Sequence, residues 1–442
     1  MKKHTQSPCE RSEISYKPSG IEWLGEIPQS WENVSIRSCF TESNQRCNTD
    51  SYPLLSVTIA NGIIYQDNIE NKKDISNDDK SNYKIVPLNA VAYNKMRMWQ
   101  GAVGVNTLTT GIVSPAYIVA IPNEKILPNF VSYLFKSKIM IGEFDKNSYG
   151  LCLDMNNLRY DDFRNIKIPL PPLQEQKEIA EFLDSRCEKI QNYIDKKQKL
   201  ITLLQEKKQA LINKVVTKGL NPNIESKNSG IEYLGLIPHH WEVVKVKYIA
   251  TTNIGLVYDP SEIATNENVG YPVLRANNIQ NGKIDYKDVI YVAKKIDDKQ
   301  LAISGDLLMC VRNGSENLLG KTAKIENNNF SFGAFTAIIR SDLNNYLYWI
   351  FQTEMLKKSI SSFIVSIGIG QISQDDIKNF KIPLPPLQEQ KEIAEFLDKK
   401  CEKINSAIEK TKRQIKLIKE YKNTLINEAV CGRINLQKKE RI

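Results

Sequence analysis

The chain has 442 residues, of which 41% are hydrophobic and 25% are charged. This length exceeds one ordinary hydrophobic core and the composition excludes a disordered or fibrous protein, so we expect several folded units. Lys and Arg number 60 against 51 Asp and Glu, and the resulting charge of +9 suits a polyanionic partner without requiring one.

Residues 1–18 form a polar N-terminal tail that has no apolar segment of the kind found in secretory signals. No later stretch has the roughly 18 uninterrupted apolar residues of a membrane span. The eight cysteines are scattered without a C-x-x-C pair, a pattern typical of reduced thiols. We therefore expect a cytoplasmic protein without a membrane partner.

Two motifs occur twice along the chain. Residues 19–37 (SGIEWLGEIPQSWENVSIR) are matched by 229–247 (SGIEYLGLIPHHWEVVKVK), and 167–184 (KIPLPPLQEQKEIAEFLD) recur letter for letter at 381–398. Such a repeat indicates two tandem half-molecules. The predicted order is a domain at 19–172, a long helix at 173–220, a second domain at 221–386 that opens with a short linker at 221–228, a second long helix at 387–434 and a tail at 435–442.

The two globular halves differ in sequence but share a coarse skeleton. An Asn-Gly pair lies between strand-like runs at 55–65 and again at 274–286, which is the strongest short signal for a tight hairpin. Apolar strand-like runs follow at 87–94 and 305–311. The turn-rich loops after them have unrelated sequences, KMRMWQG and RNGS. Each half is therefore predicted to be a mixed α+β domain with common scaffolding and individual loops.

The repeated segment after each domain predicts a long helix. In the first copy the prolines of 169–172 favour an extended entry, Glu175 suits the positive end of a helix, and Gly219 and Pro222 supply the stop. About 45 intervening residues at 1.5 Å each would make a rod on the order of 65 Å long.

Apolar residues recur every three or four positions along both helices, which is typical of a coiled-coil seam. One alternative is that each helix packs only on its own domain. The matched lengths and seams instead favour an antiparallel pair, because a tandem repeat closes by pseudo-twofold symmetry only if its equivalent helices run in opposite directions. One register, with Lys197 opposite Thr411, places Leu183 near Leu425. The predicted seam residues are Ile179, Leu183, Ile190, Ile201, Leu204 and Leu211, and Ile393, Leu397, Ile404, Ile415, Ile418 and Leu425.

The order of these motifs, with SGIEWLGEIPQSWE opening each half and PLPPLQEQKEIAEFLD closing it, resembles the specificity subunits of type I restriction-modification systems over nearly the whole chain. The resemblance implies an α+β fold class, with two pseudo-symmetric mixed α/β target-recognition domains separated by two long helices that form an antiparallel coiled coil. It also implies that each domain reads one part of a split double-stranded DNA sequence. The helices would bind two modification methyltransferase subunits, which restriction subunits join in phage defence.

The same resemblance implies a chain that is not an enzyme and binds no cofactor or metal itself. S-adenosylmethionine, ATP and Mg²⁺ would be used by the partner subunits. The repeat supports this division of labour, since identical helical surfaces suit two identical partners and dissimilar loops suit dissimilar half-sites. For both domains to meet one face of the duplex, the half-sites should lie about one helical turn apart, roughly 34 Å.

Candidate DNA contacts are polar residues near the variable loops. Phosphates favour Lys and Arg, guanine favours Arg, and adenine favours Asn or Gln. For any one of these residues, solvated surface is an alternative interpretation. The candidates are Asn94, Lys95, Arg97, Trp99 (as a stacking or wedge residue), Gln100 and Asn106 in the first domain, and Arg275, Asn277, Asn278, Arg312, Asn313, Lys321 and Gln371 in the second.

Catalytic motifs are poorly matched. Residues 314–322 (GSENLLGKT) have the wrong glycine spacing for a P-loop, 366–371 (SIGIGQ) lack the third glycine of a dinucleotide site, and the three histidines show no zinc spacing. The acid pairs at 161–162 and 375–376 are interpreted as turn or cap residues. Two alternatives remain, namely a coiled-coil scaffold whose globular halves bind protein, and a self-sufficient nuclease or methyltransferase.

Overall fold

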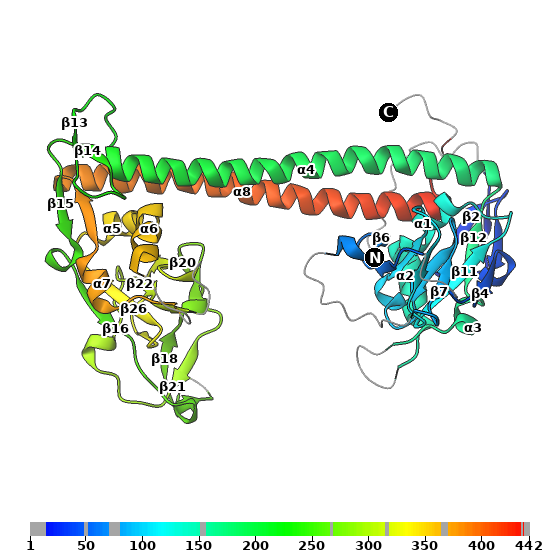
Figure 1. The fold of residues 1–442 in the computed structure, drawn as a ribbon, viewed down its shortest axis with the longest axis horizontal. Coiled ribbons are helices and arrows are strands. Elements are labelled where there is room, and N and C mark those ends of the chain that lie inside the picture. The colour runs from blue at the N-terminus through cyan, green and yellow to red at the C-terminus, as the bar shows by residue number, and fades with distance from the viewer. Residues whose placement is uncertain are drawn as a thin grey trace, which may run out of the picture. The chain divides into compact units, whose positions relative to one another are not determined.

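The computed structural model describes residues 15–47, 52–69, 80–150, 156–265, 268–313, 318–363, 370–434 and 436. The chain forms two compact units, one made of Met1–Lys197 with Arg413–Ile442 and the other of Gln198–Lys412 (Figure 1). Each of the two long helices is thus divided between the units. We call the globular part of the first unit domain 1 and that of the second unit domain 2.

Domain 1 is built on a four-stranded antiparallel sheet of order β4-β11-β8-β9. Side chains alternate between its faces, as strand geometry requires. Val91 and Tyr93 face the core formed with helices α1 and α2, while Ala92 packs under the β5–β6 hairpin. The elements are β4 (Phe40–Ser43), β5 (Leu55–Thr58), β6 (Gly62–Tyr65), β7 (Lys84–Val86), β8 (Val91–Asn94), β9 (Val103–Val105), β10 (Gly111–Val113), β11 (Tyr117–Pro122), α1 (Pro128–Lys136), α2 (Lys138–Lys146) and α3 (Tyr160–Phe163).

Domain 2 repeats this sheet in the order β16-β26-β22-β24 and extends it with β20 and β19. Leu307 and Met309 face the core formed with helix α5, and Leu308 faces a second core under strand β18. The elements are β16 (Thr251–Ile254), β17 (Ile263–Ala264), β18 (Tyr271–Leu274), β19 (Ile279–Gln280), β20 (Lys283–Ile284), β21 (Ile290–Val292), β22 (Leu307–Cys310), β23 (Arg312–Asn313), β24 (Thr322–Lys324), β25 (Ser331–Phe332), β26 (Thr336–Arg340), α5 (Asn344–Phe351), α6 (Glu354–Phe363), β27 (Gly370–Gln371) and α7 (Gln374–Asn379).

Both Asn-Gly hairpins are confirmed. Strand β5 pairs with β6, and β19 pairs with β20. Asn281 and Gly282 both have positive φ, as a two-residue type I′ turn requires. Two details of the prediction were wrong. Strand β8 begins only at Val91, because Asn89 turns the chain with φ 67°, and Arg312 lies in the short strand β23 rather than in an open loop.

The repeated motifs meet one another in both units. Strand β3 (Glu32–Ser35) pairs with β12 (Lys167–Leu170), and β15 (Glu242–Lys245) pairs with β28 (Lys381–Leu384) in the equivalent register. A small hairpin lies at the start of each half, where β1 (Tyr16–Pro18), just before the first motif, pairs with β2 (Glu26–Pro28), and β13 (Ser226–Asn228) pairs in the same way with β14 (Leu236–Pro238). The two stretches that are alike in sequence therefore build one shared base under each domain.

The long helices begin where the proline pattern predicts, α4 at Leu173 and α8 at Leu387. Helix α4 spans Leu173–Lys218 and α8 spans Leu387–Val430. Gly219 and Gly432, just beyond the two ends, have φ values of 71° and 73°, which glycine adopts without the steric cost of a side chain. This left-handed turn lets the chain leave each helix abruptly.

Within each unit the two helices run antiparallel and pack together, which confirms the predicted fold class. In the first unit the start of α4, at Leu183, shares a core with the end of α8, at Leu425. In the second unit the end of α4, at Leu211, shares a core with the start of α8, at Leu397. These contacts agree with the register proposed from the sequence. Of the seam residues, Ile179, Leu183, Ile190, Ile201, Ile393, Leu397 and Ile415 are buried, and Leu204, Leu211, Ile404, Ile418 and Leu425 are half-buried.

A buried tryptophan fixes each domain to both helices. Trp31 donates its Nε1–H to Glu175 Oε2 (2.7 Å) in the first turn of α4, and Trp241 donates to Glu389 Oε2 (3.0 Å) in the first turn of α8. Each ring also covers the end of the other helix, because a side chain added at Gly432 would meet Trp31 and one added at Gly219 would meet Trp241. The two junctions are therefore equivalent in chemistry.

Candidate nucleic-acid interface

The variable loops lie at the same place in both domains. The loop at 95–102 joins β8 to β9, and the segment at 311–321 joins β22 to β24, which are the matching strands of the repeated sheet. The structure thus brings Lys95, Arg97, Trp99 and Gln100 in domain 1 to a position equivalent to that of Arg312, Asn313 and Lys321 in domain 2. Unlike side chains here sit on a common scaffold.

The domain 1 loop is folded on itself by its own polar groups. Asn94 Oδ1 accepts from the Met96 amide (3.0 Å), and Trp99 Nε1 donates to the Met96 carbonyl (3.1 Å). Lys95 is half-buried, and its carbonyl accepts from the amide of Leu158. The side chains of Arg97 and Gln100 are exposed. Asn94 and Trp99 therefore shape the loop, whereas Arg97 and Gln100 point charge and amide groups to solvent.

Asn106 was predicted as a base reader, and its placement argues against that role. Its side chain is fully buried, with Nδ2 donating to the carbonyls of Val86 (2.9 Å), Pro87 (3.1 Å) and Thr109 (2.8 Å). Its Oδ1 accepts from the amide of Leu108 (3.2 Å). A buried amide with its donors and acceptor occupied stabilises the turn around it and has no free edge for a base.

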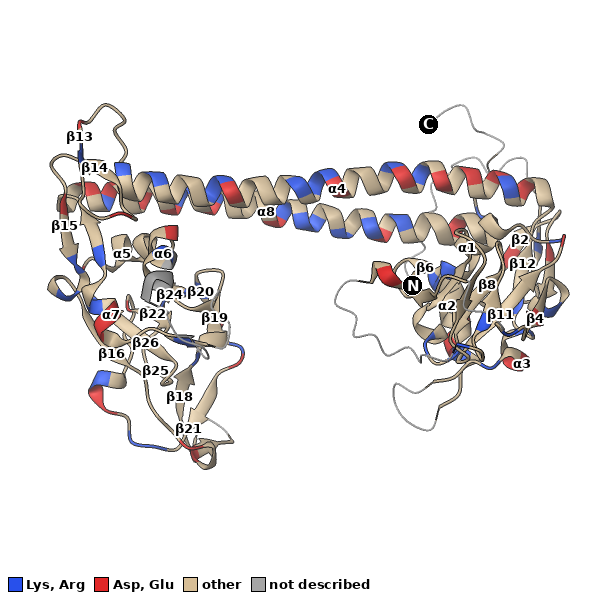
Figure 2. Cartoon of the chain, in the orientation of Figure 1, with Lys and Arg blue, Asp and Glu red and all other residues tan. Residues whose placement is uncertain are grey.

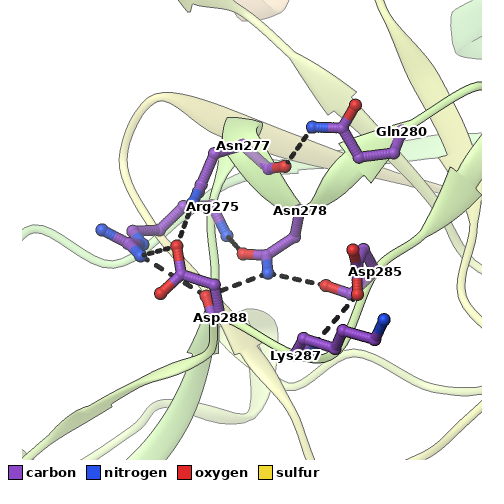
Figure 3. Close-up of polar contacts among 7 residues, drawn as sticks. All are labelled: Arg275, Asn277, Asn278, Gln280, Asp285, Lys287 and Asp288. Carbon is purple, nitrogen blue, oxygen red and sulfur yellow. Dashed lines mark hydrogen bonds and ion pairs between the residues drawn. The ribbon is translucent and has the colours of Figure 1, made fainter. Parts of the chain in front are cut away.

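In domain 2 a polar cluster follows strand β18 (Figure 3). The carboxylate of Asp288 accepts from Arg275 Nη2 (3.2 Å) and from Asn277 Nδ2 (2.6 Å), so one acid orients two candidate readers. Gln280 Nε2 donates to the carbonyl of Asn277 (2.8 Å). Asn277 is exposed and Arg275 is half-buried. Because Asp288 lies between them, it both fixes their geometry and opposes the approach of a phosphate.

Asn278, a third candidate of this cluster, was predicted to contact DNA, and its placement argues against that role. Only 1% of it is exposed, and its Nδ2 donates to the carbonyls of Asp285 (2.8 Å) and Asp288 (3.1 Å). Its Oδ1 accepts from the Arg275 amide (2.8 Å). Asn278 therefore holds the Asp288 loop against the strand that carries Arg275, and it has no group left to read a base.

A cavity of about 540 Å³ lies beside this cluster. Its lining includes Arg275, Asn277 and the exposed ring of Phe335. The guanidinium of Arg312 lies over the Phe335 ring, 5.2 Å from its centre, and Arg312 faces Gln371 across the β23–β27 pair. The structure thus places Arg275, Asn277 and Arg312 near Phe335, and Gln371 opposite Arg312 in the neighbouring strand.

The remaining candidates of domain 2 are placed near this group. Lys321 is half-buried, and its carbonyl accepts from the Cys310 amide at the end of β22. Asn313 is half-buried and follows Arg312 in β23. The sequence did not point to Phe335 or Asp288. Phe335 follows a Gly-Ala pair, which is a weak turn signal, whereas nothing in the sequence sets Asp288 apart from other acids.

Charge on the long helices is mixed. Figure 2 shows Lys and Arg interspersed with Asp and Glu along α4 and α8. On the side seen in Figure 2 the helices present no single-sign stripe of the kind that a polyanion-binding helix has.

The acid pairs before the long helices have structural roles. Asp376 completes a capping box with Ser373 at the start of α7, and Asp375 pairs with Lys378 (3.6 Å). Asp161, exposed in the first turn of α3, pairs in the same way with Arg164 (3.6 Å), which follows that helix. The contacts of Asp375 and Asp376 agree with their interpretation as turn and cap residues, and Asp161 lies in a solvated turn.

The two glycine motifs of the sequence lie partly outside the described residues. In the P-loop-like segment, residues 314–317 lie outside the described part of the chain, as does Gly368 of the second glycine motif. Across the described ranges, no group of three or more His, Cys, Asp or Glu side chains is arranged to hold a metal ion. Among the described helices, none is both long and apolar enough to cross a membrane.

These features define a class of protein, namely two unlike domains of one architecture, each fixed by the same junction to an antiparallel helix pair. The family model described as "Type I restriction modification DNA specificity domain" matches the chain twice, over residues 28–203 and 238–417. The chain belongs to this family. It is accordingly a specificity subunit, a recognition component rather than a catalytic one, and the alternative of a protein-binding scaffold is not favoured.

Individual relatives agree with this assignment. The MjaVIII specificity subunit of Methanocaldococcus jannaschii is 31% identical, in a match that covers 74% of this chain and 75% of the relative. The EcoKI specificity subunit of Escherichia coli K12 is 29% identical over 45% of this chain and 44% of its own length. The fold resembles that of the HsdS subunit from Thermoanaerobacter tengcongensis (TM-score 0.52, 19% identity, 92% and 98% covered). A chain from a structure of a type I restriction-modification complex aligns with a TM-score of 0.71 (17% identity, 92% and 99% covered).

Proposed function

We propose that domain 1 and domain 2 each read one part of a split double-stranded DNA target. The observation that carries this proposal is the contrast between the loops at 95–102 and 311–321. They join matching strands of the equivalent sheets of the two domains, yet their sequences differ, and the described part of 311–321 contains the short strand β23 whereas 95–102 contains no strand. Two unlike readers on one scaffold suit an asymmetric, bipartite sequence.

Recognition would combine two kinds of contact. Exposed cations such as Arg97 and Arg312 contact phosphates or guanine edges, and the amides of Gln100 and Asn277 are suited to adenine. In domain 2 the ion pair with Asp288 orients Arg275, so that its guanidinium is less available to any nearby phosphate. Phosphate contacts give affinity and base contacts give discrimination.

We further propose that the long helices bind two copies of a methyltransferase subunit. Leu203 on α4 and Leu417 on α8 occupy equivalent positions of the repeat and are 50% and 55% exposed. The starts of α4 and α8 have the same sequence although the domain residues that contact them differ. Asp184 accepts from Tyr133 Oη (2.6 Å) in the first unit, whereas Asp398 accepts from Trp349 Nε1 (3.1 Å) in the second. Packing against the domains therefore does not explain why residues 173–184 and 387–398 are identical, whereas binding two identical partners does.

In this proposal the complex works in the cytoplasm, and restriction subunits join the methyltransferase core. S-adenosylmethionine, ATP and Mg²⁺ are used by those partners.

The length of the long helices sets the gap between the half-targets. Four residues added to both helices lengthen each by about 6 Å and keep the apolar seam close to its original face, because they rotate the helix by about 400°, roughly 40° more than one turn.

Mapping of methylated bases in cells that carry this chain and its methyltransferase partner tests the proposal. We expect one bipartite motif with an unspecified gap. Replacing residues 19–172 with the corresponding domain of a relative should change one half of the motif only, and the four-residue insertion should change the gap only. An unchanged motif after the domain exchange contradicts the proposal.

A further inference from the structure

Two residues, one in each domain, occupy equivalent positions at the end of the first α-helix of the domain. Lys136 is the last residue of α1, and Gln352 follows the last residue of α5. The next residue makes the same hydrogen bond in both domains, Ser137 Oγ to the Leu134 carbonyl and Thr353 Oγ1 to the Ile350 carbonyl (2.6 Å each). Lys136 and Gln352 are therefore structural counterparts with different side chains.

Lys136 joins two loops of domain 1. Its ammonium donates to the carbonyls of Thr58 (3.1 Å) and Ile59 (2.8 Å) in the β5–β6 turn, and to the carbonyl of Gly101 (2.9 Å) at the end of the variable loop. Three donors meet three acceptors, which is the full capacity of the charged amine. Burial lowers the pKa of Lys136 to about 8, so the ammonium form still predominates at neutral pH.

The β5–β6 hairpin lies directly on the strand that follows the variable loop. A Cβ added to Gly104 in β9 would come within 2.7 Å of the Ile63 amide nitrogen and 2.9 Å of Gly62 Cα. The backbones therefore touch, and Lys136 Cε lies 3.8 Å from the Cβ position of Gly62. Any change in this contact moves the turn and the variable loop together.

Gln352 makes the corresponding link in domain 2 with an amide. Its Nε2 donates to the carbonyl of Thr322 (2.9 Å), at the end of the variable segment. Its Oε1 lies beside the Asn-Gly turn, 3.5 Å from the Cβ position of Gly282, which the Tyr348 hydroxyl approaches more closely (2.6 Å). Gln209 of helix α4 donates to the Gln352 carbonyl (3.0 Å), so this link is also held from the long helix.

We propose that Lys136 and Gln352 are positioning residues for sequence recognition, each hydrogen-bonded to the backbone at the end of its domain's variable loop, beside the Asn-Gly turn, and so fixing how that domain reads its half of the target. This inference rests on the proposed function. Neither residue needs to contact DNA. The difference between them, a cation with three carbonyls against an amide with one, lets the two domains hold loops of different shape on one scaffold.

The test measures discrimination at each half-target separately. The full chain, assembled with its methyltransferase subunits, is titrated with duplexes that carry single base-pair substitutions in either half of the mapped motif. With K136M, discrimination in the domain 1 half should fall about tenfold, the size of one good base contact, and stay within about twofold in the other half. Q352M should give the reverse.

The matched control is K138M, which removes an exposed lysine two residues away and should leave discrimination unchanged in both halves. The half-target that is not affected serves as an internal control for folding. If K136M does not assemble, K136Q places the domain 2 residue in domain 1, and the same one-sided loss is expected. Wild-type discrimination in both halves, or an equal loss in both, overturns the inference. A wild-type complex that discriminates at neither half overturns the proposed function instead.

Discussion

The base of each domain and its variable loop meet different physical demands, as a comparison of the two domains shows. At the base, Trp31 and Trp241 make the same hydrogen bond to the first turn of a helix and cover the end of the other helix. At the loops, a self-folded turn in domain 1 corresponds to a short strand pair in domain 2. A junction buried on several sides tolerates few side chains, whereas a loop whose tip is exposed can vary without loss of the fold.

The junction itself still admits a change at its edge. Ser30 Oγ donates to Glu175 Oε1 (3.0 Å) in the first unit, and His240 Nε2 lies 2.6 Å from Glu389 Oε1 in the second. Both polar groups reach the carboxylate that accepts from tryptophan. Since these positions are partly exposed, either residue can satisfy the acid without disturbing the buried ring.

We expect the largest effect from removing the tryptophan at each junction, and comparing the two variants tests whether the junctions contribute equally to stability. W31A and W241A each remove a ring that is at most 2% exposed, and each should lower the free energy of unfolding of its unit by about 3–5 kcal/mol. Denaturant unfolding followed by circular dichroism measures this change. W99A, which removes a less buried ring from the loop, serves as the control and should cost much less. Strongly unequal losses for Trp31 and Trp241 would show that the junctions are not equivalent.

The next effect concerns the exposed repeat position on the helices. L203D and L417D each place a charge in a proposed methyltransferase contact, and each should weaken one of two binding events by about 30-fold, the effect of losing a contact worth about 2 kcal/mol. Mass measurement of the assembled complex should show one methyltransferase lost per variant and both lost in the double variant. K207A, near Leu203, is a control for general surface changes. Two methyltransferases bound by the double variant would exclude this surface.

An effect of comparable size distinguishes the two loops. R97A should weaken binding at the domain 1 half-target and R312A at the domain 2 half-target, each by about 1–3 kcal/mol if a guanine is read. If the contact is to phosphate, the loss is the same for all sequences and the slope of log affinity against log salt falls by about one. Fluorescence anisotropy at several salt concentrations distinguishes these results. Full affinity with unchanged sequence preference would remove that arginine from the interface.

The smallest expected effect is a gain, not a loss, of affinity for DNA. D288N removes a carboxylate beside Arg275 and Asn277, and affinity for DNA of unrelated sequence should rise about twofold to fivefold, because a repulsion is lost and Arg275 is released. Discrimination in the domain 2 half-target should fall at the same time. D298N, in the same domain, is the control with equal charge change. Weaker binding to every sequence would instead mean that Asp288 supports the fold of its loop.

Much of the architecture was predictable from local patterns. The exact repeat predicted two half-molecules, the three-and-four spacing predicted helices α4 and α8, and the Asn-Gly pairs predicted both hairpins. These signals depend on neighbours a few residues apart, where backbone period and turn geometry are decided. The family resemblance rested on the same motifs, and the family model matches both halves.

The candidate interface was less predictable. Arg275, Asn277 and Arg312 lie near Phe335, with Gln371 opposite Arg312, but Asn106 and Asn278 proved to be buried residues that stabilise turns. The sequence around an asparagine that follows a strand does not show whether its side chain faces solvent or the interior. Its role depends on which carbonyls reach it from strands far along the chain, and no local pattern records them.

The sequence by itself determined the repeat, the type of most elements and the places where they turn, because these follow from short-range periodicity and glycine or proline chemistry. Only the tertiary structure decided that the two repeated motifs pair as β3 with β12 and β15 with β28, and that Trp31 and Trp241 each contact both helices. It also decided that Lys136 links two loops. These contacts join residues tens to hundreds of positions apart, and they form only when the cores bring those segments together.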